Sequence, residues 1–321
     1  MSYFLWPEGR VHWRACIKKP GTGILSIEER LDRLYPGARP VLFPSARAGL
    51  SAIIETLQLG RSQKVGIPPF ASHCVWNAVS WRADPVVPST DMPVSAYVVY
   101  HQWGYTHRCS SETILIEDSA DSLCLPGRPL FPNGGRFEIL SLPKILGTLC
   151  GGVVFCRRQD DADRVRAVRE ARPGRGWTQF ALRVLMRYGF SFGTYWQGAE
   201  FLNGGIPAPA CADILDRLES LDQIISSRRA HLEKVVDLLP AWAKPEQDRL
   251  PCAVPVLCTD RMAATLHTNG LISRPRHFNR SRSYPNTDMV RVVPVPVHQD
   301  VPVEWLTRVR ETLAPYRSET Q

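Results

Sequence analysis

The sequence predicts an α/β protein with a large, mainly parallel sheet domain flanked by helices and a small carboxy-terminal α/β domain. Between residues 41 and 156, short apolar runs alternate with helical patterns, which is typical of parallel strands covered by helices. A long amphipathic pattern follows, and residues 251–321 then supply further strands and helices. The chain has 321 residues and is 44% hydrophobic, so it can bury one large and one small core.

The elements of the large domain follow from apolar runs and the breakers between them. Apolar or β-branched runs predict strands at 41–44, 64–67, 96–100, 113–116, 137–140 and 153–156. Helical spacing predicts helices at 46–57, 72–81, 161–170 and 179–188. We assign residues 1–210 to this domain, and its first 40 residues form an amino-terminal segment that is hard to place.

A long helix is predicted to connect the two domains. Its apolar residues are spaced by three and four positions within 211–240, and Pro240 and Pro245 end it. Residues 241–321 form the small domain, with a strand after Pro251, a helix at 261–267, a strand at 290–293 and a last helix at 303–313.

Composition indicates a cytoplasmic protein without a metal site. Nine cysteines are scattered singly and form no Cys-x-x-Cys pair, which suits reduced thiols and provides no zinc spacing. No apolar run is long enough to span a membrane. The first residues lack a basic region followed by an apolar stretch, so we expect no export signal.

The net charge of +8 raises the question of an anionic partner. Arginines gather in residues 157–175 and 274–282. A solvated basic face is the simplest interpretation, and binding of a nucleotide diphosphate comes next. Nucleic acid comes last, because no helix-turn-helix, RNA-recognition or zinc-finger pattern is present.

Lys144 is the first candidate catalytic residue. Its sequence neighbours Leu142, Pro143, Ile145 and Leu146 are apolar, and such surroundings disfavour the ammonium form. A lysine with a lowered pKa is what Schiff-base chemistry needs. The alternative is an ordinary lysine whose stem packs on apolar surface while its amine reaches water.

Asp118 is the second candidate. Four apolar or β-branched residues lead into it, so it should lie at the carboxyl end of a buried parallel strand, where open α/β sheets bind ligands. A carboxylate there can keep a pyridine nitrogen protonated, as pyridoxal phosphate requires. The alternative is a carboxylate that caps the next helix. A third stretch, from Ser45 to Arg47, opens a helix whose free N–H groups can bind phosphate.

These three pieces, in this order, resemble the DegT/DnrJ group of sugar aminotransferases within the fold-type I pyridoxal phosphate enzymes. Other segments from about residue 41 to 313 resemble family motifs in the same order. They are the Pro-aromatic segment of 68–79, the His-x-aromatic-Gly turn of 101–104, the Glu-Asp-x-Ala motif of 117–121, the asparagine loop at 203 and the Pro-x-His turn of 296–298.

The resemblance implies roles around the cofactor ring. Lys144 would form the Schiff base with pyridoxal 5'-phosphate, and Asp118 would pair with the pyridine nitrogen. Asp121 stands where the family commonly has Gln or His near the phenolic oxygen, and an acid there would repel a phenolate unless another donor intervenes. His73, or less favourably Phe70, would stack on the ring, although a buried core histidine is the alternative.

The resemblance also implies a phosphate site. Ser45, the backbone of Ala46 and the side chain of Arg47 would hold the phosphate. Ser141 would be a second ligand, at a spacing from the lysine that is shorter than in the family. In the family, the counterpart of Asn203 reaches the phosphate of the neighbouring subunit, which implies a homodimer with shared sites. The arginine that usually follows this asparagine is missing here.

The implied reaction moves an amino group from glutamate to the keto group of a nucleotide-linked sugar. His101 and Trp103 would lie on the substrate side, and Arg276 and Arg280 could meet the diphosphate. Two alternatives stay open within the fold: a degenerate member that binds only cofactor or a partner protein, and an enzyme that acts on another amino substrate.

Overall fold

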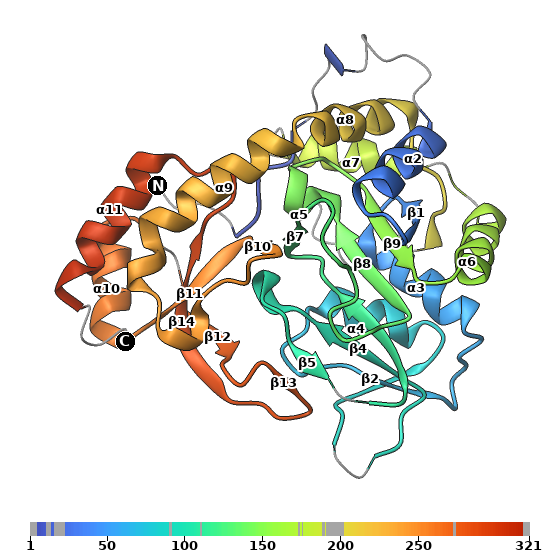
Figure 1. The fold of residues 1–321 in the computed structure, drawn as a ribbon, viewed down its shortest axis with the longest axis horizontal. Helices are drawn as coiled ribbons and strands as arrows, with labels where there is room; N and C mark the ends of the chain where they lie inside the picture. The colour runs from blue at the N-terminus through green and yellow to red at the C-terminus, as the bar shows by residue number, and fades with distance from the viewer. Residues whose placement is uncertain are drawn as a thin grey trace.

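The computed structural model confirms the predicted α/β fold. It describes residues 5–10, 14–15, 23–89, 92–109, 111–172, 174, 176–187, 190, 202–271 and 274–316. The expected amino-terminal segment is therefore described only in part. Figure 1 shows the large sheet with its helices on the right, and the smaller sheet with its helices on the left.

The large sheet has seven strands in the order β1-β9-β8-β6-β4-β2-β3. Neighbouring strands from β8 to β3 are paired in parallel, and β9 is antiparallel to both β1 and β8. The strands are β1 (Arg39–Phe43), β2 (Lys64–Gly66), β3 (Asp84–Val86), β4 (Ala96–Tyr100), β6 (Ile114–Asp118), β8 (Phe137–Ser141) and β9 (Gly152–Cys156). All residues of β8 and β9 are buried, as expected for strands covered on both faces.

Helices surround this sheet and place residues at its edge. They are α2 (Ile24–Leu34), α3 (Ala46–Thr56), α4 (His73–Ser80), α5 (Leu142–Leu146), α6 (Gln159–Ala171) and α7 (Trp177–Arg187). One apolar cluster lies between the sheet and the helices α3 and α4. Because α3 follows β1 and α5 follows β8, both helices begin at the edge where the parallel strands end.

The connection expected as one helix over 211–240 consists of two helices, α8 (Ala208–Glu219) and α9 (Leu221–Val235), followed by a short 3-10 turn (Val236–Leu238). The interruption is at Ser220, whose hydroxyl donates to the carbonyl of Asp216 at 3.2 Å. Such a back-bond competes with regular helix hydrogen bonding, which accounts for the break. Figure 1 shows α8 and α9 following one another from the large part to the small part.

The small part is built on a three-stranded antiparallel sheet in the order β11-β14-β12. Its elements are β11 (Ala253–Leu257), α10 (Asp260–Thr268), β12 (Arg276–Asn279), β14 (Met289–Pro296) and α11 (Val303–Leu313). Two short ribbons tie it to the large part, one joining β7 (Ser122–Cys124) to β10 (Arg249–Pro251) and one joining β5 (Arg108–Cys109) to β13 (Ser283–Tyr284).

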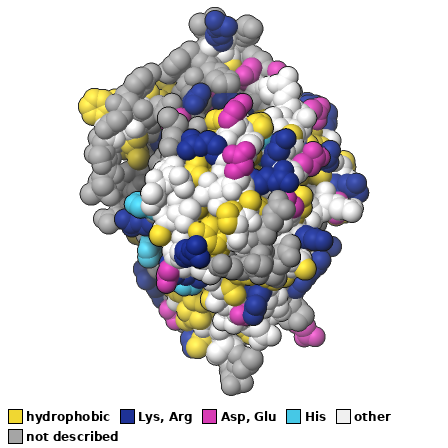
Figure 2. All heavy atoms as spheres, turned by 90° about the vertical axis from the view of Figure 1, so that its left-hand side faces the viewer, with side chains coloured by type: hydrophobic (Ala, Val, Ile, Leu, Met, Phe, Trp, Pro, Cys, Tyr) yellow, Lys and Arg dark blue, Asp and Glu magenta, His cyan; other side chains and the backbone are white. Residues whose placement is uncertain are grey.

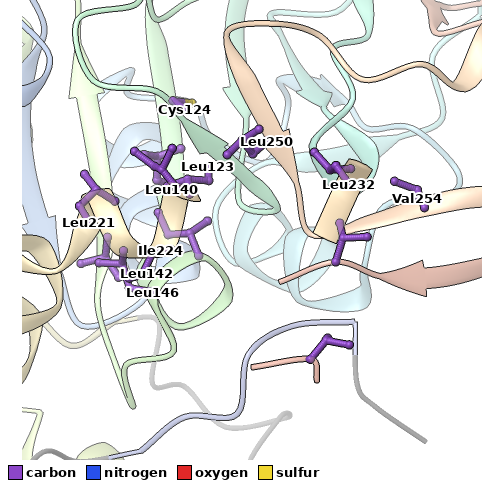
Figure 3. Packing of buried hydrophobic residues seen from close by; sticks show 14 of the residues in the cluster. Leu123, Cys124, Leu140, Leu142, Leu146, Leu221, Ile224, Leu232, Leu250 and Val254 are labelled. Carbon is purple, nitrogen blue, oxygen red and sulfur yellow. The ribbon is translucent and has the colours of Figure 1, made fainter. Parts of the chain in front are cut away.

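The largest apolar cluster runs through both parts. Figure 3 shows Leu142 and Leu146 of α5 beside Leu221 and Ile224 of α9, with Val254 of β11 farther along the same cluster. The short helix α5 is therefore fixed by apolar packing against α9, one of the two helices that connect the two parts. This packing matters because α5 carries Lys144.

Figure 2 shows basic and acidic side chains interspersed on one face of the molecule. On the small part, Arg310 of α11 pairs with Asp237 at 2.8 Å, and Arg291 of β14 pairs with Asp260. Local pairing of this kind agrees with a solvated surface and does not favour a continuous basic track for nucleic acid.

Candidate active site

A cavity of about 420 Å³ opens where the parallel strands end. Tyr100, Asp118 and Ser141 line it, and they are the last residues of β4, β6 and β8. The volume falls in the range of small-molecule sites, and the carboxyl edge of an open α/β sheet is where such sites form.

Lys144 reaches the cavity from α5. Pro143 in the first turn of this helix is pre-set for helical φ, and Gly147 ends the helix with a φ of 77°. Leu142 and Leu146 are buried, whereas the Lys144 side chain keeps 26% of its surface exposed. A five-residue helix thus buries its apolar side chains and leaves one amine at the wall of the cavity.

The amine of Lys144 has two close partners. Its Nζ lies 2.9 Å from Oδ1 of Asp121 and 4.5 Å from the ring centroid of Trp6. Burial disfavours the ammonium, but the charges of Asp121 and other acidic neighbours favour it, so the pKa of Lys144 is raised above the ordinary lysine value. The expectation of a lowered pKa is therefore wrong, because the charge of Asp121 offsets the effect of the apolar surroundings.

Asp118 lies at the end of β6 with 6% of its surface exposed. Its Oδ1 accepts a hydrogen bond from the backbone N–H of Ala120 at 3.1 Å. Burial raises the pKa of Asp118 to about 6, Lys144 opposes this rise and the nearby Asp121 adds to it. The raised pKa shows that burial deprives the charged carboxylate of part of its solvation. A cationic ring nitrogen beside Asp118 would compensate for this loss and stabilise the charged form.

The amino terminus of α3 forms another wall. Ser45 is its N-cap, and the Oγ of Ser45 accepts a hydrogen bond from the backbone N–H of Ala48 at 3.2 Å. Gly152 lies so close that a Cβ there would collide with the backbone of Ser45 and Ala46. The helix start is thus held tightly, and Ser45, Ala46 and Arg47 all line the cavity. Free N–H groups and the helix dipole suit this wall to an anion.

Two further expected residues also face the cavity. Ser141 is 8% exposed and lies at the end of β8. His73 is the first residue of α4 and is exposed, so the alternative of a buried core histidine is wrong. Phe70 instead packs in an aromatic group with Tyr100, at a ring distance of 6.2 Å, and does not line the cavity.

The expected substrate contacts His101 and Trp103 are structural. His101 has no exposed surface, and its ring nitrogens contact Glu117 at 3.1 Å and the backbone N–H of His107 at 3.0 Å. Trp103 is 5% exposed and packs on Phe278 at a ring distance of 5.2 Å. Neither lines the cavity, because the turn that carries them is folded under the small part.

Three more expected residues lie outside the cavity of their own chain. Arg276 is exposed on β12. Arg280 follows that strand and pairs with Asp288 at 2.8 Å. Asn203 is half-buried, with its amide oxygen against the backbone of Gly174. The structure therefore does not bring these three side chains to Lys144.

Sequence reasoning missed several residues that line the cavity. Trp6 comes from a segment without a recognisable pattern and Arg183 lies in no motif, whereas Cys74 lies in the motif of 68–79 but was assigned no role there. Tyr100 had a usable signal, because it ends a predicted strand beside Asp118, as the parallel pairing of β4 with β6 confirms. Arg183 of α7 donates from Nη1 to the carbonyl of Leu149 while facing the cavity.

Within the described ranges, no three His, Cys, Asp or Glu side chains are grouped so that they could hold a metal ion. Among the same residues, no helix has the length and apolar character that crossing a membrane requires.

Comparison with known proteins identifies the family. The family model described as "Putative PLP-dependent aminotransferase" matches residues 27–311. The chain therefore belongs to this family and is an aminotransferase that depends on pyridoxal phosphate. No curated protein sequence matches it.

Solved structures confirm the fold, and those that share it include a DegT DnrJ EryC1 StrS aminotransferase. The structure of DesI with its TDP-sugar product is 18% identical, covers 98% of this chain and 93% of its own, and has a TM-score of 0.66. A DegT DnrJ EryC1 StrS aminotransferase from Brucella abortus is 15% identical, with coverages of 95% and 94% and a TM-score of 0.64. PseC from Helicobacter pylori is 11% identical, with coverages of 99% and 100% and a TM-score of 0.67.

The cavity fits the cofactor of this family. It offers an amine at Lys144, a buried carboxylate at Asp118 and a helix start at Ser45 that is shaped for an anion. The tight contact of Gly152 with this helix start leaves the backbone N–H groups fixed in place. An aldehyde, a pyridine nitrogen and a phosphate need these three kinds of partner.

Proposed function

We propose that this enzyme transfers an amino group from glutamate to the keto group of a nucleotide-linked sugar. The observation that carries the proposal is one cavity that joins the Lys144 amine, the Asp118 carboxylate and the α3 amino terminus. The sugar is supported by the fold relatives, among them DesI, which was solved with its TDP-sugar product, and PseC, which is involved in pseudoaminic acid biosynthesis.

Lys144 is proposed as the group that holds the cofactor and then moves the proton. Its Nζ lies at the cavity wall, so it can attach to the cofactor and, once released, carry a proton between substrate and cofactor. Asp118 is proposed to hold the ring nitrogen in its protonated form. When bound, pyridoxal phosphate acts as the electron sink for the breaking C–H bond.

The remaining walls orient the cofactor in this proposal. Ser45, the backbone of Ala46 and the side chain of Arg47 bind the phosphate, and Ser141 supports it from the end of β8. His73 covers one face of the ring, since it is exposed and lines the cavity.

A visible absorbance spectrum tests the role of Lys144. Purified protein is mixed with pyridoxal phosphate before and after glutamate is added, beside Lys144→Ala and the exposed control Lys64→Ala. We expect a visible band in the wild type and the control, loss of that band with glutamate, and no such band in Lys144→Ala. A band that persists in Lys144→Ala would contradict the assigned role. A band that responds to another amino acid but not to glutamate would contradict the donor.

A second experiment identifies the acceptor of the amino group. After glutamate has reacted and been removed, a nucleotide-linked keto sugar should restore the visible band, whereas the same sugar without its nucleotide should do so more slowly. If only 2-oxo acids restore it, the enzyme acts on another amino substrate and the sugar proposal is wrong.

We also propose a homodimer with shared sites. Asn203 does not reach the cavity of its own chain, which agrees with a role of Asn203 of the partner subunit at the phosphate. Light scattering would give the mass. Mixing Lys144→Ala with Asn203→Ala subunits should restore cofactor absorbance that each variant lacks alone, because one site of the mixed dimer is then intact. Failure of the mixture to do so would contradict sharing.

We place the enzyme in the cytoplasm. The eight cysteines that the structure describes are all free thiols, which agrees with a reducing compartment. Fractionation of cells that express a tagged chain tests this directly.

A further inference from the structure

The segment formed by residues 5–10, here called the strap, lies against the site. The backbone N–H of Arg10 donates to the carbonyl of Gly147, directly after α5, at 3.1 Å. The backbone N–H of Glu8 donates to Asp300 Oδ2, between β14 and α11, at 3.1 Å. The strap is therefore tied both to the helix that carries Lys144 and to the small part of the molecule.

Trp6 of the strap touches the site at two points. Its indole N–H donates to Oδ1 of Asp121 at 2.8 Å. The face of its ring lies 4.5 Å from Nζ of Lys144, a distance at which the ring quadrupole attracts an ammonium. One side chain thus contacts both members of the Lys144–Asp121 pair.

Asp121 is the centre of this group. It has no exposed surface, and a buried carboxylate is costly unless donors surround it. Its Oδ1 receives Trp6 Nε1 and Lys144 Nζ, and its Oδ2 receives the hydroxyl of Tyr100. Three donors from three separate segments therefore fix the direction of the carboxylate.

We propose that Asp121 and Trp6 are positioning residues that hold the free Lys144 side chain at the cavity wall, Asp121 by pairing with its amine and Trp6 by covering it. The inference rests on the proposed role of Lys144. It adds that the amino-terminal strap is part of the active site, and that these two residues fix the position of the lysine whenever it is not bonded to the cofactor.

Competing effects act on the Lys144 amine. Burial disfavours the charged form, and removing the carboxylate of Asp121 would leave only the weaker effects of Cys74 and Asp118 to oppose it. The ring of Trp6 attracts the ammonium of Lys144 and also limits the access of solvent and reagents to it. The titratable groups that interact with Lys144 are Cys74, Asp118, Asp121 and Cys252. The same cavity is also lined by Arg47, His73, Tyr100 and Arg183.

The test measures Lys144 itself in the full-length chain freed of cofactor. Brief acetylation with acetic anhydride over a pH series, followed by peptide mass spectrometry, gives the pH midpoint and the limiting rate of labelling at Lys144. Asp121→Asn should lower the midpoint by about 1–3 pH units, because one carboxylate within contact distance is lost. Asp248→Asn, at a half-exposed carboxylate that pairs with Arg128 and does not line the cavity, is the matched control and should leave the midpoint unchanged.

The rate at which Lys144 is acetylated tests the role of Trp6. Trp6→Leu removes the ring that covers the amine, so Lys144 should be labelled severalfold faster at high pH. Trp6→Phe keeps a ring face and should restore most of the protection. Trp81→Leu is the control, because Trp81 is exposed and does not line the cavity. Thermal unfolding of each variant confirms that it is folded.

The outcomes separate this inference from the proposed function. An unchanged midpoint in Asp121→Asn, or an unchanged rate in Trp6→Leu, overturns it whatever the enzyme transfers. If Asp121→Asn does not fold, the comparison of Trp6→Leu with Trp6→Phe still decides it. Because the labelling needs neither donor nor acceptor, a wrong choice of substrate leaves this test intact.

Discussion

The carboxylate of Asp118 allows the most quantitative test of the cofactor site. Asp118→Asn keeps the size of the side chain and its place at the end of β6 but removes the charge. A hydrogen bond to a charged group contributes about 1.5–3 kcal/mol. Since 1.4 kcal/mol is a factor of ten in a dissociation constant, the variant should bind pyridoxal phosphate about 10- to 150-fold more weakly.

The direction in which the affinity for pyridoxal phosphate changes with pH also tests the role of Asp118. The pKa of Asp118 is raised to about 6 in the cofactor-free protein, chiefly by burial. A cationic ring nitrogen binds the ionised carboxylate, so below pH 6 a proton must first leave Asp118 and the affinity should fall. Above pH 6 the carboxylate is already ionised and its contribution should level off.

The assay is a titration of each protein with pyridoxal phosphate, followed by absorbance, at several pH values from 5 to 8. The phosphate of the cofactor also titrates in this range, so the informative quantity is the difference between wild type and Asp118→Asn. Asp84→Asn, at an exposed residue of β3, is the control. Equal pH dependence in wild type and Asp118→Asn would refute the reasoning.

Two further predictions concern the scaffold of the site. Gly152→Ala should weaken cofactor binding at least tenfold, because its Cβ would collide with the backbone of Ala46 and displace the helix start, whereas Gly23→Ala has open space and should be neutral in the same titration. Arg249→Met should lower the free energy of unfolding by about 3–5 kcal/mol, because it strands the buried carboxylate of Glu138, 2.6 Å away. Burial raises the pKa of Glu138, but its hydrogen-bond and charge partners lower it overall, so the ion pair should stabilise the fold less as the pH falls below about 4.5. Denaturant unfolding over a pH series measures this, and a loss of stability in Arg249→Met that does not change with pH would contradict the prediction.

Much of the fold could be predicted because its information is local. The run before Asp118 is apolar over consecutive residues, as a strand covered on both faces requires, and the structure has β6 there with its last four residues buried. Ser45 and the spacing after it marked the start of α3. Because residues after parallel strands meet at one edge, the sequence could also predict that Lys144, Asp118 and Ser45 face a common cavity.

Other features depend on contacts that no local pattern records. The helix α5 has five residues, which is too short for a helical period to be visible. The antiparallel direction of β9 is set by its neighbours in the sheet. The resemblance places His101 on the substrate side, yet its ring is completely buried and contacts Glu117. In each case a distant partner, rather than a neighbour in sequence, decides the structure.

From the sequence alone, Asp121 is a departure that argues against a working cofactor site, whereas its surroundings in the structure are compatible with one. By resemblance, an acid at this position should repel the phenolate of the cofactor unless another donor intervenes. The structure supplies such donors: Trp6 lies 115 positions away, and Tyr100 lies on the neighbouring strand β4. An acid held by donors acts as a local counter-ion for Lys144, which an uncharged glutamine could not be. Asp121 and Trp6 therefore depend on each other: Trp6 donates a hydrogen bond to the buried carboxylate, and the two side chains together fix the position of Lys144. A related protein with only one of the two should fix the position of its lysine less firmly.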